Sequence, residues 1–385
     1  MQTPAERWDI FCRVVDNYGD VGVSWRLARQ VAREHRKHVR LWLDDLTVLA
    51  KLRPEIDPAY DLQKLDGVEI ARIREPFDHE GVADVVVETF GCDPPESYVA
   101  AMAERERKPR WINLEYLSAE DWIEGSHALP SPNPRLPLTK HFFFPGFNAK
   151  TGGLLREESL LRRRDEFQRD PGAQAAFWNS LVRKVPPEGT LKLSLFSYSG
   201  APVEGLARSI VHHPGPVWLV APEGYAAMAL ENWRISDKAR NAIETFVVPF
   251  LAQDRYDQLL WACDVNFVRG EDSFVRAQWA GRPFVWHIYP TDDGAHWVKL
   301  AAFLARYTAD LDRPYAAAVT AMWEEWNRRA DVGSGGKMGS GLAEAWAGFV
   351  SRREILEAHA LKWAARLGSR PDLAEALVDF TDNLL

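Results

Sequence analysis

The chain has 385 residues, of which 46% are hydrophobic and 26% are charged, and its formal net charge is −8. That length suits two domains of about 150 residues each, and the composition is that of a folded globular protein. No apolar run reaches the roughly 18 residues of a membrane span, the polar opening predicts no signal peptide, and the acidic charge excludes a general attraction to nucleic acid.

The first 150 residues alternate short apolar runs with amphipathic stretches. Helices are expected over Trp25–His35 and Pro95–Arg107, and the proline-rich segment 130–145 should be irregular and end in a short strand from His141. The runs expected to form strands are Trp8–Val15, His38–Leu43, Val68–Ile73, Ala83–Glu88 and Arg110–Leu114. This alternation predicts parallel β/α layers.

The same alternation restarts after two connecting helices, Leu154–Phe167 and Ala173–Val182. From Tyr315 onward the pattern is helical, except for the glycine-rich run 332–341, which should be a mobile loop. The later strands are expected at Leu191–Tyr198, Val217–Ala221, Thr245–Phe250, Asp264–Val268 and Pro283–Ile288, with helices at Arg255–Cys263 and Phe274–Ala280.

These patterns predict an N-terminal domain over 1–153, connecting helices over 154–185 and a C-terminal domain over 186–361. The last helix, about 362–385, is expected to pack back on the N-terminal domain. Two successive β/α domains predict a cleft between two sheets. Because ligands of open α/β sheets bind beyond the carboxyl ends of the strands, the strand-to-helix loops are the places to search for function.

The first such loop is the segment 16–22, DNYGDVG, which follows the first strand. Gly19 and Gly22 permit tight backbone geometry or close approach of a ligand. Asp16 and Asp20 are compatible with a turn and a helix cap, since aspartate is common in both. They are equally compatible with a pair of carboxylates that holds or deprotonates a nucleophile. The G-x-G-x-x-G pattern of a dinucleotide site is absent.

The second loop is Arg269-Gly-Glu-Asp-Ser273, between a strand and a helix. Ser273 or Asp272 is expected to cap that helix, whose free amides and dipole would form an anion site. Arg269 adds donors suited to phosphate oxygens. A capped helix with a surface Arg–Glu pair is the alternative. Glycine, arginine and a helix start together favour binding of a diphosphate.

Aromatic and amide side chains end two other strands of the C-terminal domain. Phe196 and Tyr198 are candidates for stacking on a nucleobase, although such pairs are often part of a core. Phe250 and Gln253 occupy the equivalent position after a later strand.

A metal site is not expected. Asp310-Leu-Asp312 matches the D-x-D pattern of metal-dependent sugar transferases, but no strand precedes it. His296 is expected to be structural. The three cysteines, Cys12, Cys92 and Cys263, are too scattered for a zinc site or a disulfide framework, so a reducing cytoplasm is expected.

Taken together, the two loops resemble one family. The string DNYGDVGVSWRLARQ (residues 16–30) is similar to the opening signature of EarP, the protein-arginine rhamnosyltransferase family that acts on bacterial elongation factor P. The string RGEDSFVRAQWAGRP (269–283) resembles the second signature of that family, and Trp286–Pro290 with His296 resembles the segment after that signature. The resemblance extends from the first strand to about Leu304.

The resemblance implies an α/β fold of the GT-B type, with two facing Rossmann-like domains, an interdomain cleft and the donor site in the second domain. It implies transfer of L-rhamnose from dTDP-β-L-rhamnose, with inversion, to an arginine of folded elongation factor P. It also implies that Asp16, Asp20 and Glu271 are the essential acids and that no catalytic metal or further cofactor is used. The positions implied to bind the donor are Tyr18, Gly19, Phe196, Tyr198, Phe250, Gln253, Arg269, Asp272 and Ser273.

Aspartate is a poor base for a guanidinium, because their ordinary pKa values are near 3.9 and above about 12. A carboxylate is therefore expected to orient the guanidinium and to take its proton as the new C–N bond forms. We assign the proton to Asp20 and the orientation to Asp16. Two other functions share the donor loop: a nucleotide-sugar transferase with a small-molecule or glycan acceptor, and a non-enzymatic nucleotide-sugar-binding module.

Overall fold

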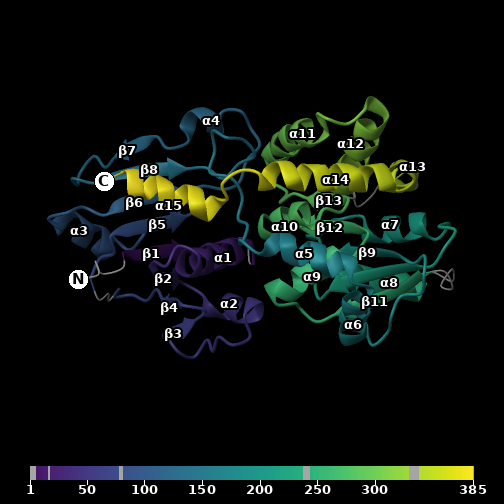
Figure 1. The fold of residues 1–385 in the computed structure, drawn as a ribbon, viewed down its shortest axis with the longest axis horizontal. Helices are drawn as coiled ribbons and strands as arrows, with labels where there is room; N and C mark the ends of the chain where they lie inside the picture. Colours follow the sequence, from purple (N-terminus) through teal and green to yellow (C-terminus); the bar gives the residue numbers. More distant parts are fainter. Residues whose placement is uncertain (1–5, 16–17, 78–80, 237–242, 329–337, 385) are drawn as a thin grey trace. The chain divides into compact units, whose positions relative to one another are not determined.

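The computed structural model describes residues 6–15, 18–77, 81–236, 243–328 and 338–384. The chain forms two compact units (Figure 1): Met1–Glu158 with Leu367–Leu385, and Ser159–Arg366. The division therefore falls after Glu158, inside the segment expected to connect the domains, and both helices of that segment belong to the second unit.

The first unit is built on an eight-stranded sheet with the order β3-β4-β2-β1-β5-β6-β8-β7. The six inner strands are parallel, and the two outermost strands each pair antiparallel with their neighbour. The strands are β1 (Arg7–Cys12), β2 (His38–Leu43), β3 (Leu62–Leu65), β4 (Val68–Arg72), β5 (Val85–Thr89), β6 (Arg110–Leu114), β7 (Pro130–Pro132) and β8 (Thr139–Phe143). The strand order reverses between β1 and β5, the position at which doubly wound sheets bind ligands.

Helices cover both faces of this sheet because its inner strands are apolar on both sides. They are α1 (Gly19–Arg33), α2 (Leu46–Leu52), α3 (Glu96–Glu104), α4 (Ile123–Ser126) and α15 (Leu373–Asn383). The C-terminal helix α15 lies beside α1, and the side chain of Asp372 caps it by accepting from the amides of Ala374 and Glu375.

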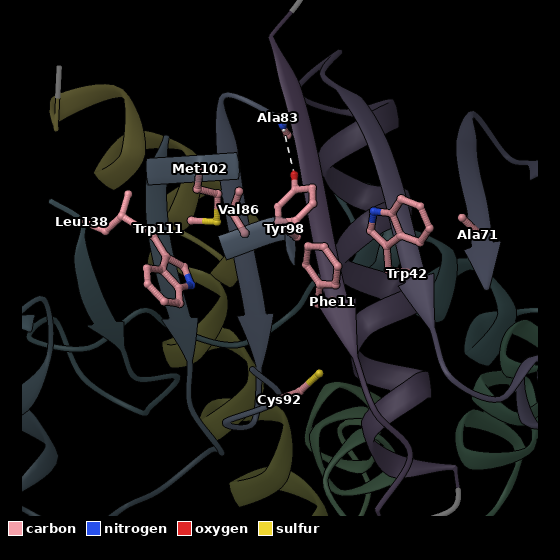
Figure 2. Packing of buried hydrophobic residues seen from close by; sticks show 10 residues of the cluster. All are labelled: Phe11, Trp42, Ala71, Ala83, Val86, Cys92, Tyr98, Met102, Trp111 and Leu138. Atoms are coloured by element: carbon pink, nitrogen blue, oxygen red, sulfur yellow. Dashed lines mark hydrogen bonds between the residues drawn. The ribbon is translucent and has the colours of Figure 1, made fainter. Parts of the chain in front are cut away.

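One face of the first sheet carries an aromatic core under α3 (Figure 2). Phe11 and Trp42, from β1 and β2, pack with Tyr98 and Met102 of α3 and with Trp111 of β6. The hydroxyl of Tyr98 accepts from the amide of Ala83 at 3.1 Å, the bond drawn in the figure. It also donates to buried Asp9, whose carboxylate accepts two bonds from Arg40 at 3.0 and 2.8 Å. The buried charges of this core are thus paired and hydrogen-bonded.

A buried carboxyl on the same sheet makes stability depend on pH. Burial raises the pKa of Glu88 from 4.5 to about 7, against the opposing hydrogen bond from Lys140. The folded chain therefore holds this proton more tightly than the unfolded chain, and the resulting stability is present below pH 4.5 and is lost as the pH rises through 7. Between pH 5 and pH 8.5 the wild type should lose up to about 3 kcal/mol relative to Glu88→Gln in urea unfolding. A difference between the two proteins that does not change with pH would contradict this.

The second unit contains a five-stranded parallel sheet with the order β11-β10-β9-β12-β13. Its strands are β9 (Leu191–Leu195), β10 (Val217–Pro222), β11 (Ile243–Val248), β12 (Val265–Arg269) and β13 (Phe284–His287). The order reverses between β9 and β12, which is again the position at which doubly wound sheets bind ligands.

The helices of the second unit supply much of its core, in which Phe284 packs against Phe303, Tyr307 and Trp323. They are α5 (Leu160–Arg169), α6 (Pro171–Val182), α7 (Val203–Ile210), α8 (Tyr225–Ser236), α9 (Gln253–Ala262), α10 (Asp272–Ala280), α11 (Ala295–Thr308), α12 (Arg313–Asn327), α13 (Met338–Val350) and α14 (Arg353–Gly368).

Several sequence-based boundaries are corrected. The first helix begins at Gly19 rather than Trp25, and α5 begins at Leu160 rather than Leu154. Of the glycine-rich run 332–341, the part from Met338 is helical rather than a loop, because α13 starts there, and residues 332–337 lie outside the described residues. Within the described residues, no helix is both long and apolar enough to cross a membrane.

Candidate functional site

The first loop places Asp20 at the switch position of the first sheet. Asp20 lies in the first turn of α1, after β1, and is 2% exposed. Its Oδ2 accepts from the amide of Val15 at 3.0 Å, and the hydroxyl of Tyr116 lies 3.4 Å from its Oδ1. The N-cap of α1 is Tyr18, so Asp20 is not the capping residue. Asp16, the other expected acid, lies outside the described residues.

Tyr18 and Gly19, expected to bind the donor, open the same helix. Tyr18 is the N-cap, and its carbonyl accepts from the amide of Gly22 at 2.9 Å. The ammonium of Lys51 lies 5.8 Å from the centre of the Tyr18 ring and 3.4 Å from its hydroxyl. Both residues therefore lie in the first unit, in the same turn as Asp20.

The second loop is fixed by a glycine turn and an indole. Gly270 has a φ of 61°, the left-handed region that favours glycine. Its carbonyl accepts from the indole nitrogen of Trp286 at 2.9 Å, and the Trp286 ring stacks on Phe274 with centroids 4.0 Å apart. The loop between β12 and α10 is thus held against β13.

The expected capping of α10 by Ser273 or Asp272 is wrong. The N-cap is Glu271, whose side chain does not cap the helix. The Ser273 hydroxyl is engaged with Arg269 instead: it accepts from the Arg269 amide at 3.1 Å and donates to the Arg269 carbonyl. Ser273 therefore fixes the backbone of Arg269. Glu271 lies at the turn where the strand becomes the helix.

Arg269 packs against two aromatic rings. Its guanidinium carbon is 4.6 Å from the centre of the Phe196 ring and 4.4 Å from that of Tyr198. The arginine is 9% exposed. Two rings of the β9 loop thus hold the cation of the neighbouring strand, an arrangement that a guanidinium favours. The structure brings together these three expected donor residues, and the two rings contact the arginine.

Gln253 and Asp272 also meet at this edge of the sheet. Gln253 is the first residue of α9, and its Nε2 donates to Oδ2 of Asp272 at 3.1 Å. A buried ion pair holds α9 to α10, because Arg276 donates to Asp257 from Nε at 2.9 Å and from Nη2 at 2.6 Å. Phe250, half-buried, lies in the loop between β11 and α9.

His287 is a residue of this site that sequence reasoning missed. Its Nδ1 accepts from the amide of Tyr198 at 3.1 Å, and it pairs with Arg269 in the β12–β13 register. Burial, and then the charges of Arg269 and His296, lower the pKa of His287 to about 4. The ring is therefore neutral at neutral pH and able to accept. Sequence reasoning had no signal for it, because its place opposite Arg269 depends on the pairing of β12 with β13.

The residues weighed for metal binding lie apart, and two of them have other partners. Asp310 pairs with Arg366 at 2.6 Å, and Asp312 precedes the first turn of α12. The Nδ1 of His296 accepts from the amide of Thr291 at 3.1 Å, a structural role. Over the described part of the chain, no three His, Cys, Asp or Glu side chains are grouped so that they could hold a metal ion.

Comparison with known proteins relates this chain to one family. The family model described as "Elongation-Factor P (EF-P) rhamnosyltransferase EarP" matches residues 8–382. The chain belongs to the EarP family.

Relatives of this EarP-family chain match it over nearly its whole length. A protein-arginine rhamnosyltransferase of Pseudomonas putida is 46% identical over 385 residues, covering 98% of this chain and 99% of the relative. One of Pseudomonas aeruginosa is 47% identical over 382 residues, covering 97% and 98%.

Solved structures agree with this assignment. A structure described as "Structural basis for EarP-mediated arginine glycosylation of translation elongation factor EF-P" is 35% identical, with a TM-score of 0.68 over 99% of this chain and 100% of that one. A UDP-glucosyltransferase from Polygonum tinctorium, 11% identical with a TM-score of 0.55 over 99% of each chain, shares the fold. The EarP-family chain therefore has the GT-B fold, with two Rossmann-like units.

Proposed function

We propose that this chain transfers L-rhamnose from dTDP-β-L-rhamnose to an arginine side chain of elongation factor P, with inversion at the anomeric carbon. Membership of the EarP family makes it a protein-arginine rhamnosyltransferase. The single observation that carries the finer proposal is the guanidinium of Arg269, which packs against Phe196 and Tyr198 where β12 leads into α10.

That arrangement suits a diphosphate. A guanidinium packed against two rings presents its donors in one orientation, and phosphate oxygens accept such paired bonds. The N-terminus of α10 follows directly, and the amides and dipole of a helix start favour an anion. Together they would offset the charge that develops on the leaving dTDP as the sugar–oxygen bond breaks. Glu271, at the turn, would order this loop or support the incoming guanidinium.

The acceptor chemistry falls to the carboxylates of the first unit. In an inverting transfer an arginine nitrogen attacks the anomeric carbon from the face opposite the diphosphate, and the nitrogen loses a proton as the C–N bond forms. Asp20 is buried and held by the amide of Val15, so its carboxylate has a fixed position. We assign the proton to Asp20 and the orientation of the guanidinium to Asp16.

The test is an incubation of the chain with dTDP-rhamnose and elongation factor P, read by intact mass. The factor should gain one deoxyhexose, which fragmentation should locate on an arginine, and NMR of the product should show the inverted anomeric configuration. Transfer from another nucleotide sugar but not from dTDP-rhamnose would refute the donor assignment. Retained configuration would refute the mechanism.

The proposal also predicts turnover without a divalent metal. Arg269 and the start of α10 supply the positive charge that a metal ion supplies in other transferases. Initial rates should therefore be unchanged when EDTA is added in excess over any contaminating metal. Activity that is lost in EDTA and returns with magnesium or manganese would show that the charge is supplied otherwise.

A further inference from the structure

An aromatic pair lies at the same edge of the first sheet as Asp20. Phe90 directly follows β5, and Tyr116 lies two residues beyond β6. Strands β1, β5 and β6 are adjacent and parallel, so the residues that follow them gather at one edge. The two rings stack with centroids 4.4 Å apart and planes inclined by 17°. This edge is where a sheet of this order binds ligands.

Tyr116 is exposed, and its hydroxyl contacts the buried carboxylate of Asp20. Its hydroxyl lies 3.4 Å from Oδ1 of Asp20, whereas the residue itself remains 37% exposed. Asp20 is 2% exposed. A group that approaches this carboxylate past Tyr116 would therefore pass an accessible aromatic surface.

Phe90 supports that ring from a backbone conformation that is rare for its residue type. Its φ is 59°, in the left-handed region, where a bulky side chain is an outlier. The amide of Phe90 donates to the carbonyl of Leu114 at 2.7 Å, and the turn is closed by the amide of Cys92, which donates to Thr89 at 3.1 Å. Residues held in such conformations cluster at functional sites.

We propose that Tyr116 binds the acceptor arginine: its exposed ring surface stacks on the guanidinium, and its hydroxyl keeps the Asp20 carboxylate oriented toward it. The inference rests on the proposed function and deepens it. A guanidinium is planar and weakly hydrated, so one face can stack on a tyrosine ring while its nitrogens bond a carboxylate that lies in the plane of the guanidinium. Phe90 would then act as a positioning residue, because it holds the Tyr116 ring and does not touch the substrate.

The two functions of Tyr116 separate by substitution. Tyr116→Leu removes the ring and should raise KM for elongation factor P about 10-fold, the loss expected for one desolvated cation–π contact. The affinity for dTDP-rhamnose should not change. Tyr116→Phe keeps the ring and should leave KM near the wild-type value, lowering kcat alone. Tyr60→Leu, which removes another exposed tyrosine of the first unit, is the matched control and should change neither constant.

The affinity for a second form of elongation factor P identifies the group that Tyr116 contacts. The comparison uses elongation factor P in which the modified arginine, located by mass mapping, is replaced by alanine, so that it can bind but cannot accept the sugar. Tyr116→Leu should weaken binding of the intact factor about 10-fold and leave binding of the alanine factor unchanged. An equal loss with both factors, or a loss with neither, would overturn the assignment of Tyr116.

The outcome is distinguishable from failure of the proposed function. If the wild type adds a deoxyhexose to the factor and Tyr116→Leu has the wild-type KM, only the inference about Tyr116 falls. If the wild type adds none, the proposed function itself falls. Because Tyr116 is exposed, the variant should fold, and an unchanged melting temperature would exclude misfolding as the cause of a raised KM.

Discussion

Asp20→Asn should lower the single-turnover rate of rhamnose transfer by at least about 100-fold, the usual contribution of a positioned base. Its affinity for dTDP-rhamnose should stay within about twofold of wild type, because the role is exercised in the transition state. Asparagine keeps the shape and one oxygen to accept from the amide of Val15, so the loop should stay folded. Rapid-quench kinetics and calorimetric titration of the same preparation measure the two quantities.

Asp44→Asn is the matched control for this loss of charge. Asp44 accepts from the amide of Val14 at 3.0 Å, as Asp20 accepts from the amide of Val15, but its side chain is exposed. If the carboxylates merely brace the loop, both variants should lose about 1 kcal/mol of stability and keep their rates. A normal rate in Asp20→Asn, with a lowered melting temperature, would refute the assignment of Asp20 as the base. The sequence predicts the same loss of rate for Asp16→Asn.

The inner strands of both sheets were predictable because they are apolar runs bounded by turn residues. The strands His38–Leu43 and Arg110–Leu114 match β2 and β6 residue for residue. The outer strand β3 was missed, since its side chains are polar or exposed on an edge. Asp66 and Gly67, both with positive φ, join it to β4, and this Asp-Gly pair was the available hairpin signal.

The starts of α1 and α10 were less predictable. Gly19 and Gly22 suggested a turn, yet α1 begins at Gly19, so Asp20 belongs to a helix rather than a loop. Serine is a common N-cap residue, so Ser273 was expected to cap α10, but its hydroxyl accepts from the backbone amide of Arg269. A side chain near a helix start has several backbone groups within reach, and the local sequence does not specify which one it bonds.

The contacts around Arg269 depend on strand order, which sequence alone did not supply. Phe196 and Tyr198 follow β9, whereas Arg269 ends β12, more than 70 residues later. These strands become neighbours only because the sheet order reverses between them. The sequence therefore identified the three residues as donor candidates, while their mutual contact appeared only with the fold.

The second large expected effect concerns Arg269, whose guanidinium contacts the two rings. Arg269→Ala should weaken binding of dTDP by about 1.5–3 kcal/mol, the range for a hydrogen bond to a charged group. Thymidine lacks the diphosphate, so its affinity should not change. Arg208→Ala removes an exposed arginine that pairs with Glu204 on α7, and it should bind both ligands as the wild type does. Calorimetric titrations with each ligand measure this. Unchanged affinity for dTDP would refute the diphosphate site.

Phe196→Leu and Tyr198→Leu decide what the two rings do. If they hold Arg269 in place, each variant should weaken the binding of dTDP and leave the binding of thymidine unchanged, as Arg269→Ala does. The reason is that the guanidinium is no longer held in a fixed orientation. If they stack on the nucleobase, both ligands should weaken equally, since the base is common to both. The distances of 4.6 and 4.4 Å from the guanidinium to the two rings favour the first pattern. In the double variant Phe196→Leu/Arg269→Ala the two losses should then not add, because the ring has no cation left to hold.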